Sequence, residues 1–308
     1  MAGILIRKIA ELFCYMFMGF FLVRAHILKK EDAAVLSKLA IHLIMPFSIL
    51  GAFLVPFSLD VLKGIGIAII AYAAIKAVVL PAASLYGKMT GANVVEITSI
   101  GYSNVGNLVL PIVGSVLGTE WMVYVVGAIT VNHLFFWTHG IRYFSGDRKF
   151  HPKAFFLNMN IICLIAGFVI YICRIPMPGI AETAVTTVGS MIGPFSMLIT
   201  GVVLGGMPLQ DMFRNKRIFP VTAMRMLAMP MLAIILLKIL RLDRFVTNGE
   251  TILLIVLLSE LTPSANLINQ SAVLYHKDPE YASAIQIFST LVSIVAIPLM
   301  VTVYQAII

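Results

Sequence analysis

Ten apolar runs, each close to the length needed to cross a bilayer, dominate this chain. About 20 apolar residues form a helix that spans a hydrocarbon core roughly 30 Å thick. The runs cover residues 9–28, 39–59, 65–85, 94–117, 122–138, 155–174, 181–204, 219–240, 252–275 and 281–304. Within lipid every backbone polar group needs an internal partner, which a helix provides. We therefore predict an all-α membrane protein with ten transmembrane helices.

The composition supports this class and argues against several others. Hydrophobic residues make up 60% of the chain and charged residues only 12%, whereas a soluble domain is typically about one quarter charged. The net charge of +8 is spread over short connections, which fits charges that flank membrane spans and not a nucleic-acid surface. The cysteines show no metal-ligand spacing and no catalytic dyad stands out. We predict no metal, no cofactor and no enzymatic activity.

Polar residues interrupt the fourth and ninth runs near their middles. The sequence GYSNVGNLVLP occupies residues 101–111, and LTPSANLINQ occupies residues 261–270. Paired breaks, one in each half of a chain, are a sequence pointer to a transporter site. The candidate substrate-binding residues at these breaks are Asn104, Asn107, Pro111, Pro263, Ser264, Asn266 and Gln270, with Asn269 as a further amide.

Helix ends exposed at such breaks have opposite electrostatic character. The N-terminal ends present unpaired N–H groups that suit an anion, and the C-terminal ends present carbonyls that suit a cation. Pro111 and Pro263 have no N–H group, so each leaves a carbonyl one turn earlier without its donor. If the two broken helices cross, a carboxylate can bind at their positive ends. The alternative is that the polar groups only satisfy one another at a structural kink.

Three ionisable residues fall at membrane depth. Lys76 and Arg225 lie in the third and eighth runs, and Glu260 directly precedes the second break. Charges at this depth usually mark pathways, relays or ion pairs. Glu260 could take up a coupling proton or hold a sodium ion, while Lys76 or Arg225 could attract an anion or neutralise Glu260. The alternative for the two bases is that they extend towards the interface.

The two halves of the chain repeat one another. Pro46-Phe47-Ser48 recurs as Pro194-Phe195-Ser196, and the pair Lys76 and Pro81 recurs as Arg225 and Pro230. Each half contains five runs, so the second half must enter the membrane inverted, as in secondary transporters. We predict a first repeat over residues 1–143, a cytoplasmic connection over 144–153 and a second repeat over 154–308.

The distribution of basic residues predicts the orientation. Connections after the odd-numbered spans carry more Lys and Arg than the connections on the other side, so they should be cytoplasmic. Both termini of this multi-pass chain would then be extracytoplasmic, in the cell membrane. The small-residue pattern from Gly201 to Gly205 would allow close helix contact, with a dimer surface as one use.

The break motifs resemble those of a known family. SNVGNLVLP at 103–111, the stretch 261–299 and the stretch 19–50 are similar to the auxin efflux carrier family, in particular its prokaryotic malate-permease-like members. The resemblance implies two inverted five-helix repeats, as in bile-acid symporters and sodium/proton antiporters. It also implies crossover prolines at Pro111 and Pro263 and crossover asparagines at Asn107 and Asn266.

The resemblance further implies a division of labour among the spans. Spans 1, 2, 6 and 7 would form a scaffold that commonly forms a homodimer, and spans 3–5 and 8–10 would form a moving transport domain. Substrates would be organic anions such as malate-like dicarboxylates or indole acetic acid. We expect a secondary carrier of small carboxylates that works by elevator-type alternating access, with a proton or sodium as the possible coupling ion. The alternative is a sodium- or proton-coupled cation carrier of the same fold.

Overall fold

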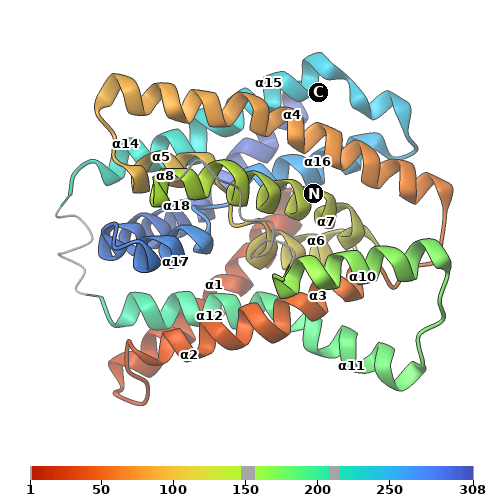
Figure 1. The fold of residues 1–308 in the computed structure, drawn as a ribbon, viewed down its shortest axis with the longest axis horizontal. Helices are drawn as coiled ribbons and strands as arrows, with labels where there is room; N and C mark the ends of the chain where they lie inside the picture. The colour runs from red at the N-terminus through yellow and green to blue at the C-terminus, as the bar shows by residue number, and fades with distance from the viewer. Residues whose placement is uncertain (1, 147–156, 208–214, 308) are drawn as a thin grey trace.

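The computed structural model describes residues 2–146, 157–207 and 215–307, and helix occurs within each of the predicted apolar runs (Figure 1). Most of the predicted connection 144–153 lies outside these described residues. The first two predicted spans are shifted. The first helix ends at Arg24 and not at residue 28, and the second helical span covers Asp32–Ala52 and not 39–59. His26 adopts a left-handed backbone with φ of 58°, which a continuing α-helix does not allow.

The helices of the first half run without long irregular segments. They are α1 (Ala2–Arg24), α2 (Asp32–Leu39), α3 (Met45–Ala52), α4 (Leu59–Thr90), α5 (Val94–Gly101), α6 (Leu110–Val116), α7 (Met122–Phe135) and α8 (Ile141–Ser145). The second half contains α10 (Met159–Cys173), α11 (Gly179–Ser190), α12 (Ile192–Gly205), α14 (Ile218–Ala223), α15 (Met229–Leu240), α16 (Gly249–Glu260), α17 (Asn266–Leu274) and α18 (Pro279–Ile307).

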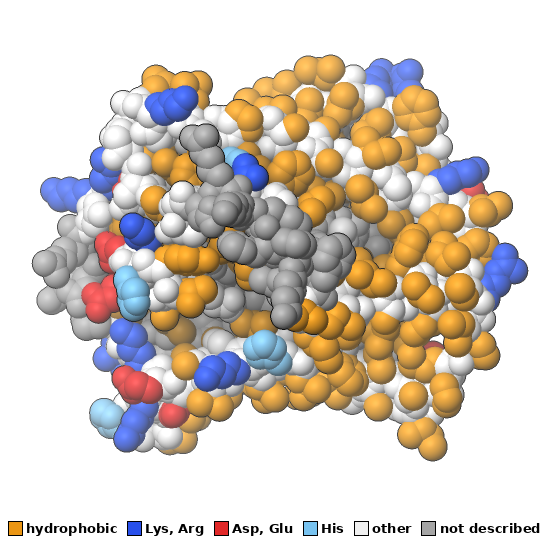
Figure 2. Space-filling view, in the orientation of Figure 1, with side chains coloured by type: hydrophobic (Ala, Val, Ile, Leu, Met, Phe, Trp, Pro, Cys, Tyr) orange, Lys and Arg blue, Asp and Glu red, His pale blue; other side chains and the backbone are white. Residues whose placement is uncertain are grey.

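Several helical segments are long and apolar enough to cross a membrane. Within the described residues, six satisfy this by length and composition, and two shorter apolar helices accompany them. The six are Asp32–Ala52, Leu59–Thr90, Thr119–Ser145, Gly179–Gly205, Ile218–Leu240 and Pro279–Ile307. Figure 2 shows a broad apolar surface on one face, with charged side chains gathered mainly at one end. The chain is thus an all-helical, multi-span membrane protein.

Short π-helical segments precede three prolines. They are η1 (Ala40–Ile44) before Pro46, η2 (Val105–Val109) before Pro111 and η5 (Met224–Ala228) before Pro230. A proline removes the N–H that would bond the carbonyl four residues earlier. The chain accommodates this with wider turns, as in the bond from the Met229 N–H to the Met224 carbonyl five residues back. A fourth π segment, η4 (Phe136–Gly140), has no such proline.

The helices pack in two groups that Figure 1 shows on opposite sides of the molecule. On one side α1 packs along α12, and α3 packs against α10 and α11. On the other side α4 packs against α7, α15 and α16. Gly201 and Gly205 of α12 lie directly on the backbone of α1, at Met16 and Phe20. The small-residue pattern therefore serves a contact within the chain, and the suggestion that it forms a dimer surface is wrong.

Candidate transport site

The two helix breaks meet at one place inside the molecule. Between α5 and η2 the chain is extended, as it is between α16 and α17. Ser103 and Ser264 form an antiparallel bridge across these two stretches. The Asn104 N–H donates to the Pro263 carbonyl at 3.0 Å, and the Ala265 N–H donates to the Tyr102 carbonyl at 3.1 Å. One backbone N–H group of each break is therefore paired with a carbonyl of the other break.

The three predicted membrane-depth charges form one buried cluster beside this crossing. Lys76 Nζ lies 2.8 Å from Glu260 Oε2, and Arg225 Nη1 lies 2.8 Å from Glu260 Oε1. All three side chains are fully buried. Both bases are therefore ion-pair partners of Glu260, and neither side chain extends towards the interface. Two cations against one carboxylate give the ionised cluster a net charge of +1.

The same two bases also occupy the C-terminal ends of both half-helices. Lys76 donates to the Gly101 carbonyl at 2.9 Å, at the end of α5. Arg225 donates to the Ile100 carbonyl on α5 at 3.0 Å, and to the Thr262 carbonyl after α16, also at 3.0 Å. It further donates to the Glu260 carbonyl. The negative helix ends, which would otherwise attract a cation, are thereby filled by the protein's own side chains.

Ser103 links the cluster to the crossing, and its role was missed by the sequence reasoning. Its Oγ accepts from Arg225 at 2.7 Å and from the Tyr72 hydroxyl at 3.1 Å, and it lies 3.1 Å from Glu260 Oε2. Asn132 Nδ2 donates to the Ser103 carbonyl at 3.1 Å. The position of Ser103 inside the first break was the available signal. Tyr72 and Asn132 lie in unbroken helices, and no comparable sequence signal points to them.

Amide side chains lie at the N-terminal ends of the half-helices that follow the crossing. Asn104 and Asn107 are buried before and within η2, and Asn107 Oδ1 has no hydrogen-bond partner among the described residues. Asn266 begins α17, where its Oδ1 accepts from Gln286 Nε2. Gln286 Oε1 in turn accepts from Asn269 Nδ2. Gln286 comes from α18, outside both break motifs, so sequence reasoning missed it.

Of the remaining predicted site residues, some lie in the crossing and others lie outside it. Pro263 and Ser264 are buried in the crossing, and the Ser264 N–H donates to Ser289 Oγ at 3.2 Å. Pro111 packs against Gly193 of α12, on the other helix group. Gln270 is exposed, one turn along α17 from Asn266. The crossing thus gathers most of the predicted residues, while Gln270 lies at its periphery.

The C-terminal and N-terminal helix ends at the crossing carry different kinds of side chain. The C-terminal ends are neutralised by Lys76 and Arg225, whereas the N-terminal ends carry neutral amides. N-terminal ends and a net positive cluster both favour an anion nearby. A carboxylate has the charge and the acceptor atoms to bind such a place.

A family model described as a membrane transport protein matches residues 4–301. The chain belongs to this family. It is the auxin efflux carrier family, so the resemblance carried by the break motifs is confirmed over nearly the whole chain. Proteins of this family are transporters and not enzymes, in agreement with the prediction from the sequence. Among curated proteins, none matches the chain.

Proposed function

We propose that this auxin efflux carrier family member is a secondary transporter of small organic carboxylates, such as malate-like or auxin-like anions. One observation carries the proposal: built-in cations fill the C-terminal ends at the crossing, and the N-terminal ends remain for a ligand. Asn104, Asn107 and Asn266 would bind the carboxylate there. The net positive charge of the buried cluster would help to compensate the substrate's charge.

The same cluster argues against the cation carrier considered as the alternative. A coupling sodium or a transported cation would need free carboxylate or carbonyl oxygens. Both carboxylate oxygens of Glu260 are within 2.8 Å of a basic group, and carbonyls of both half-helices accept from the same bases. We propose that Glu260 has a charge-compensating role, and the pH gradient in the experiment below tests for a coupling proton.

The proposed movement is an elevator in which two inverted five-helix repeats supply a scaffold and a transport domain. The two helix groups support this division, because α1, α3, α10, α11 and α12 pack together while α4 packs against α7, α15 and α16. The crossing also faces the other group, since Gly106 lies against Met45 of α3 and Pro111 lies against Gly193. A site at such a boundary could be exposed first to one side of the membrane and then to the other. A scaffold-mediated homodimer is part of the proposal.

The test is electrical. We would reconstitute the protein in liposomes and record charge movement on adding malate, succinate, lactate, indole acetate or sodium chloride, with and without a pH gradient. Asn107→Ala and Asn266→Ala should each abolish carboxylate currents, because each removes an amide at an N-terminal helix end. Asn160→Ala is the matched control, since Asn160 is buried on α10, outside the crossing.

The outcomes distinguish the anion carrier from the cation carrier. Carboxylate currents that persist in the Asn160 variant and vanish in both crossing variants would establish the anion site. Unchanged currents in both crossing variants would show that Asn107 and Asn266 do not bind the carboxylate. Sodium-evoked currents with no response to any carboxylate would replace the anion carrier with the cation carrier.

A further inference from the structure

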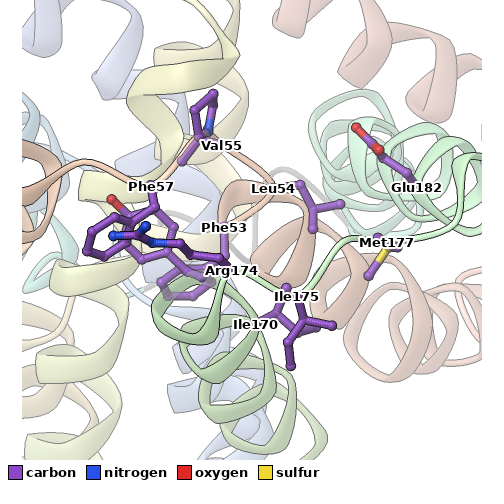
Figure 3. Close-up of a pocket in the computed structure, with 11 residues that line it drawn as sticks. Phe53, Leu54, Val55, Phe57, Ile170, Arg174, Ile175, Met177 and Glu182 are labelled. Carbon is purple, nitrogen blue, oxygen red and sulfur yellow. The ribbon is translucent and has the colours of Figure 1, made fainter.

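A cavity of about 550 Å³ lies away from the crossing, where the linker between α3 and α4 meets the end of α10 and the start of α11 (Figure 3). Its walls are mainly aromatic and aliphatic. Phe53 and Phe57 come from the linker, and Ile170 and Tyr171 come from α10. The Phe57 and Tyr171 rings lie 5.3 Å apart between centroids, so the two sides of the cavity touch.

Arg174 places a cation at one end of this cavity. Its guanidinium carbon lies 4.3 Å from the centroid of the Phe57 ring. Among the described residues, no carboxylate lies within salt-bridge distance of it, and Glu182 lies at the other end of the cavity in Figure 3. A guanidinium stacked on a ring still has its in-plane N–H groups available, and these match the oxygens of a phosphate.

α10 also carries an apolar stripe, on the face that points away from the buried Tyr171. Ile162, Ile165, Val169 and Ile172 are exposed and recur at helical spacing, so they lie along one face of the helix. The helix ends at Cys173, and Arg174 follows it with a left-handed backbone at φ of 53°. A basic residue at the end of an apolar helix marks the level where lipid headgroups meet the hydrocarbon core.

We propose that this cavity binds an anionic phospholipid, with the phosphate on Arg174 and the acyl chains against the apolar walls of the cavity, which include the exposed Ile175. The apolar walls, the cation that has no carboxylate partner among the described residues and the apolar exterior of α10 together match an amphipathic anion, and a small soluble anion would leave the apolar surface uncovered. The lipid would be a bound partner of the protein and not a transported substrate.

The site adjoins a connection that would bend during transport. The Tyr171 hydroxyl donates to the Ser58 carbonyl at 3.0 Å and accepts from the Ser58 N–H at 3.1 Å, so α10 holds the start of α4. A lipid in the cavity would contact the linker and α10 together and restrain their relative movement. This regulatory consequence rests on the proposed elevator, whereas the binding site does not.

The experiment measures lipid retention by native mass spectrometry of the full-length protein, after incubation with phosphatidylglycerol or phosphatidylcholine. Arg174→Gln should lower phosphatidylglycerol retention several-fold and leave phosphatidylcholine retention unchanged. The matched control is Arg241→Gln, because Arg241 is also an exposed, left-handed residue directly after a helix, α15, and does not line the cavity. Phe57→Leu keeps the charge and removes the ring, and should cause a smaller loss.

Equal phosphatidylglycerol retention by the Arg174 and Arg241 variants would overturn the proposal. So would displacement of the lipid by glycerol phosphate at similar concentrations, since that would identify a soluble phosphate as the ligand. Because retention is read without transport, failure of the lipid site and failure of the proposed transport function are distinguishable.

Discussion

At the scale of single residues, Glu260 is a carboxylate held entirely inside the protein. It is fully buried and has a basic group at each carboxylate oxygen. Burying charges is costly, and the cost is offset only where geometry and additional hydrogen bonds are good. Here the extra bonds come from Ser103 and from backbone carbonyls at the ends of α5 and α16. The cluster therefore ties the crossing to α4 and η5.

Removing Glu260 alone should be more damaging than removing it together with Lys76. Glu260→Gln leaves two buried cations without a carboxylate, and breaking a buried pair in this way costs about 3–5 kcal/mol. Glu260→Gln with Lys76→Met leaves only Arg225, which keeps its bonds to the Ile100 and Thr262 carbonyls. Thermal unfolding in detergent should rank the double variant as more stable than the single one. A double variant that unfolds at the same temperature or lower would contradict this account.

At the scale of elements, the sequence predicted where helices break but not how their turns are wound. The apolar runs and the polar interruptions at residues 101–111 and 261–270 located the broken helices. The π segments η1, η2 and η5 were not predicted, although each lies just before a proline. Pro81 and Pro298 lie inside α-helices without a preceding π segment, so proline alone does not determine the outcome.

Replacing Pro230 should rewind η5. Alanine restores an N–H for the Met226 carbonyl, which favours a regular α-helix in place of the wider turn. Losing one residue of bulge rotates the preceding turn by about 100°, which would carry Arg225 away from Glu260. We expect Pro230→Ala to lower the unfolding temperature, and hydrogen exchange over residues 224–231 to change. Pro298→Ala is the control and should be neutral or stabilising; equal behaviour of the two variants would refute the link.

At the scale of the whole molecule, the all-helical membrane class and the paired helix breaks could be predicted from the sequence. The contacts between distant side chains that define the site could not. Lys76 and Glu260 are separated by 184 residues, and hydropathy contains no information about which distant side chains meet. Gln286 was missed for the same reason, since it lies in an uninterrupted apolar helix. The family match covers the chain but leaves the orientation in the membrane as a prediction.

Cys173 provides a native test of that orientation. It is exposed at the end of α10, on the side predicted to be extracytoplasmic, whereas Cys163 on the same helix is buried. Cys14 is also exposed, but it lies in the middle of the apolar α1, where the bilayer would shield it from a water-soluble reagent. A membrane-impermeant maleimide added to intact cells should label the protein, and Cys173→Ser should abolish the labelling. Labelling that requires permeabilised cells would invert the predicted topology.

The net positive charge of the buried cluster determines which step of the proposed transport cycle responds to membrane voltage. Lys76, Arg225 and Glu260 all lie on helices of the proposed moving domain, so the ionised cluster would carry a buried charge of +1 through the membrane's electric field. A bound monocarboxylate would cancel it, making the loaded step insensitive to voltage. The empty domain would be drawn inward by an interior-negative voltage, by up to about 2.3 kcal/mol per 100 mV. Resetting of the empty carrier, and not passage of the substrate, would then be the step through which membrane voltage drives export.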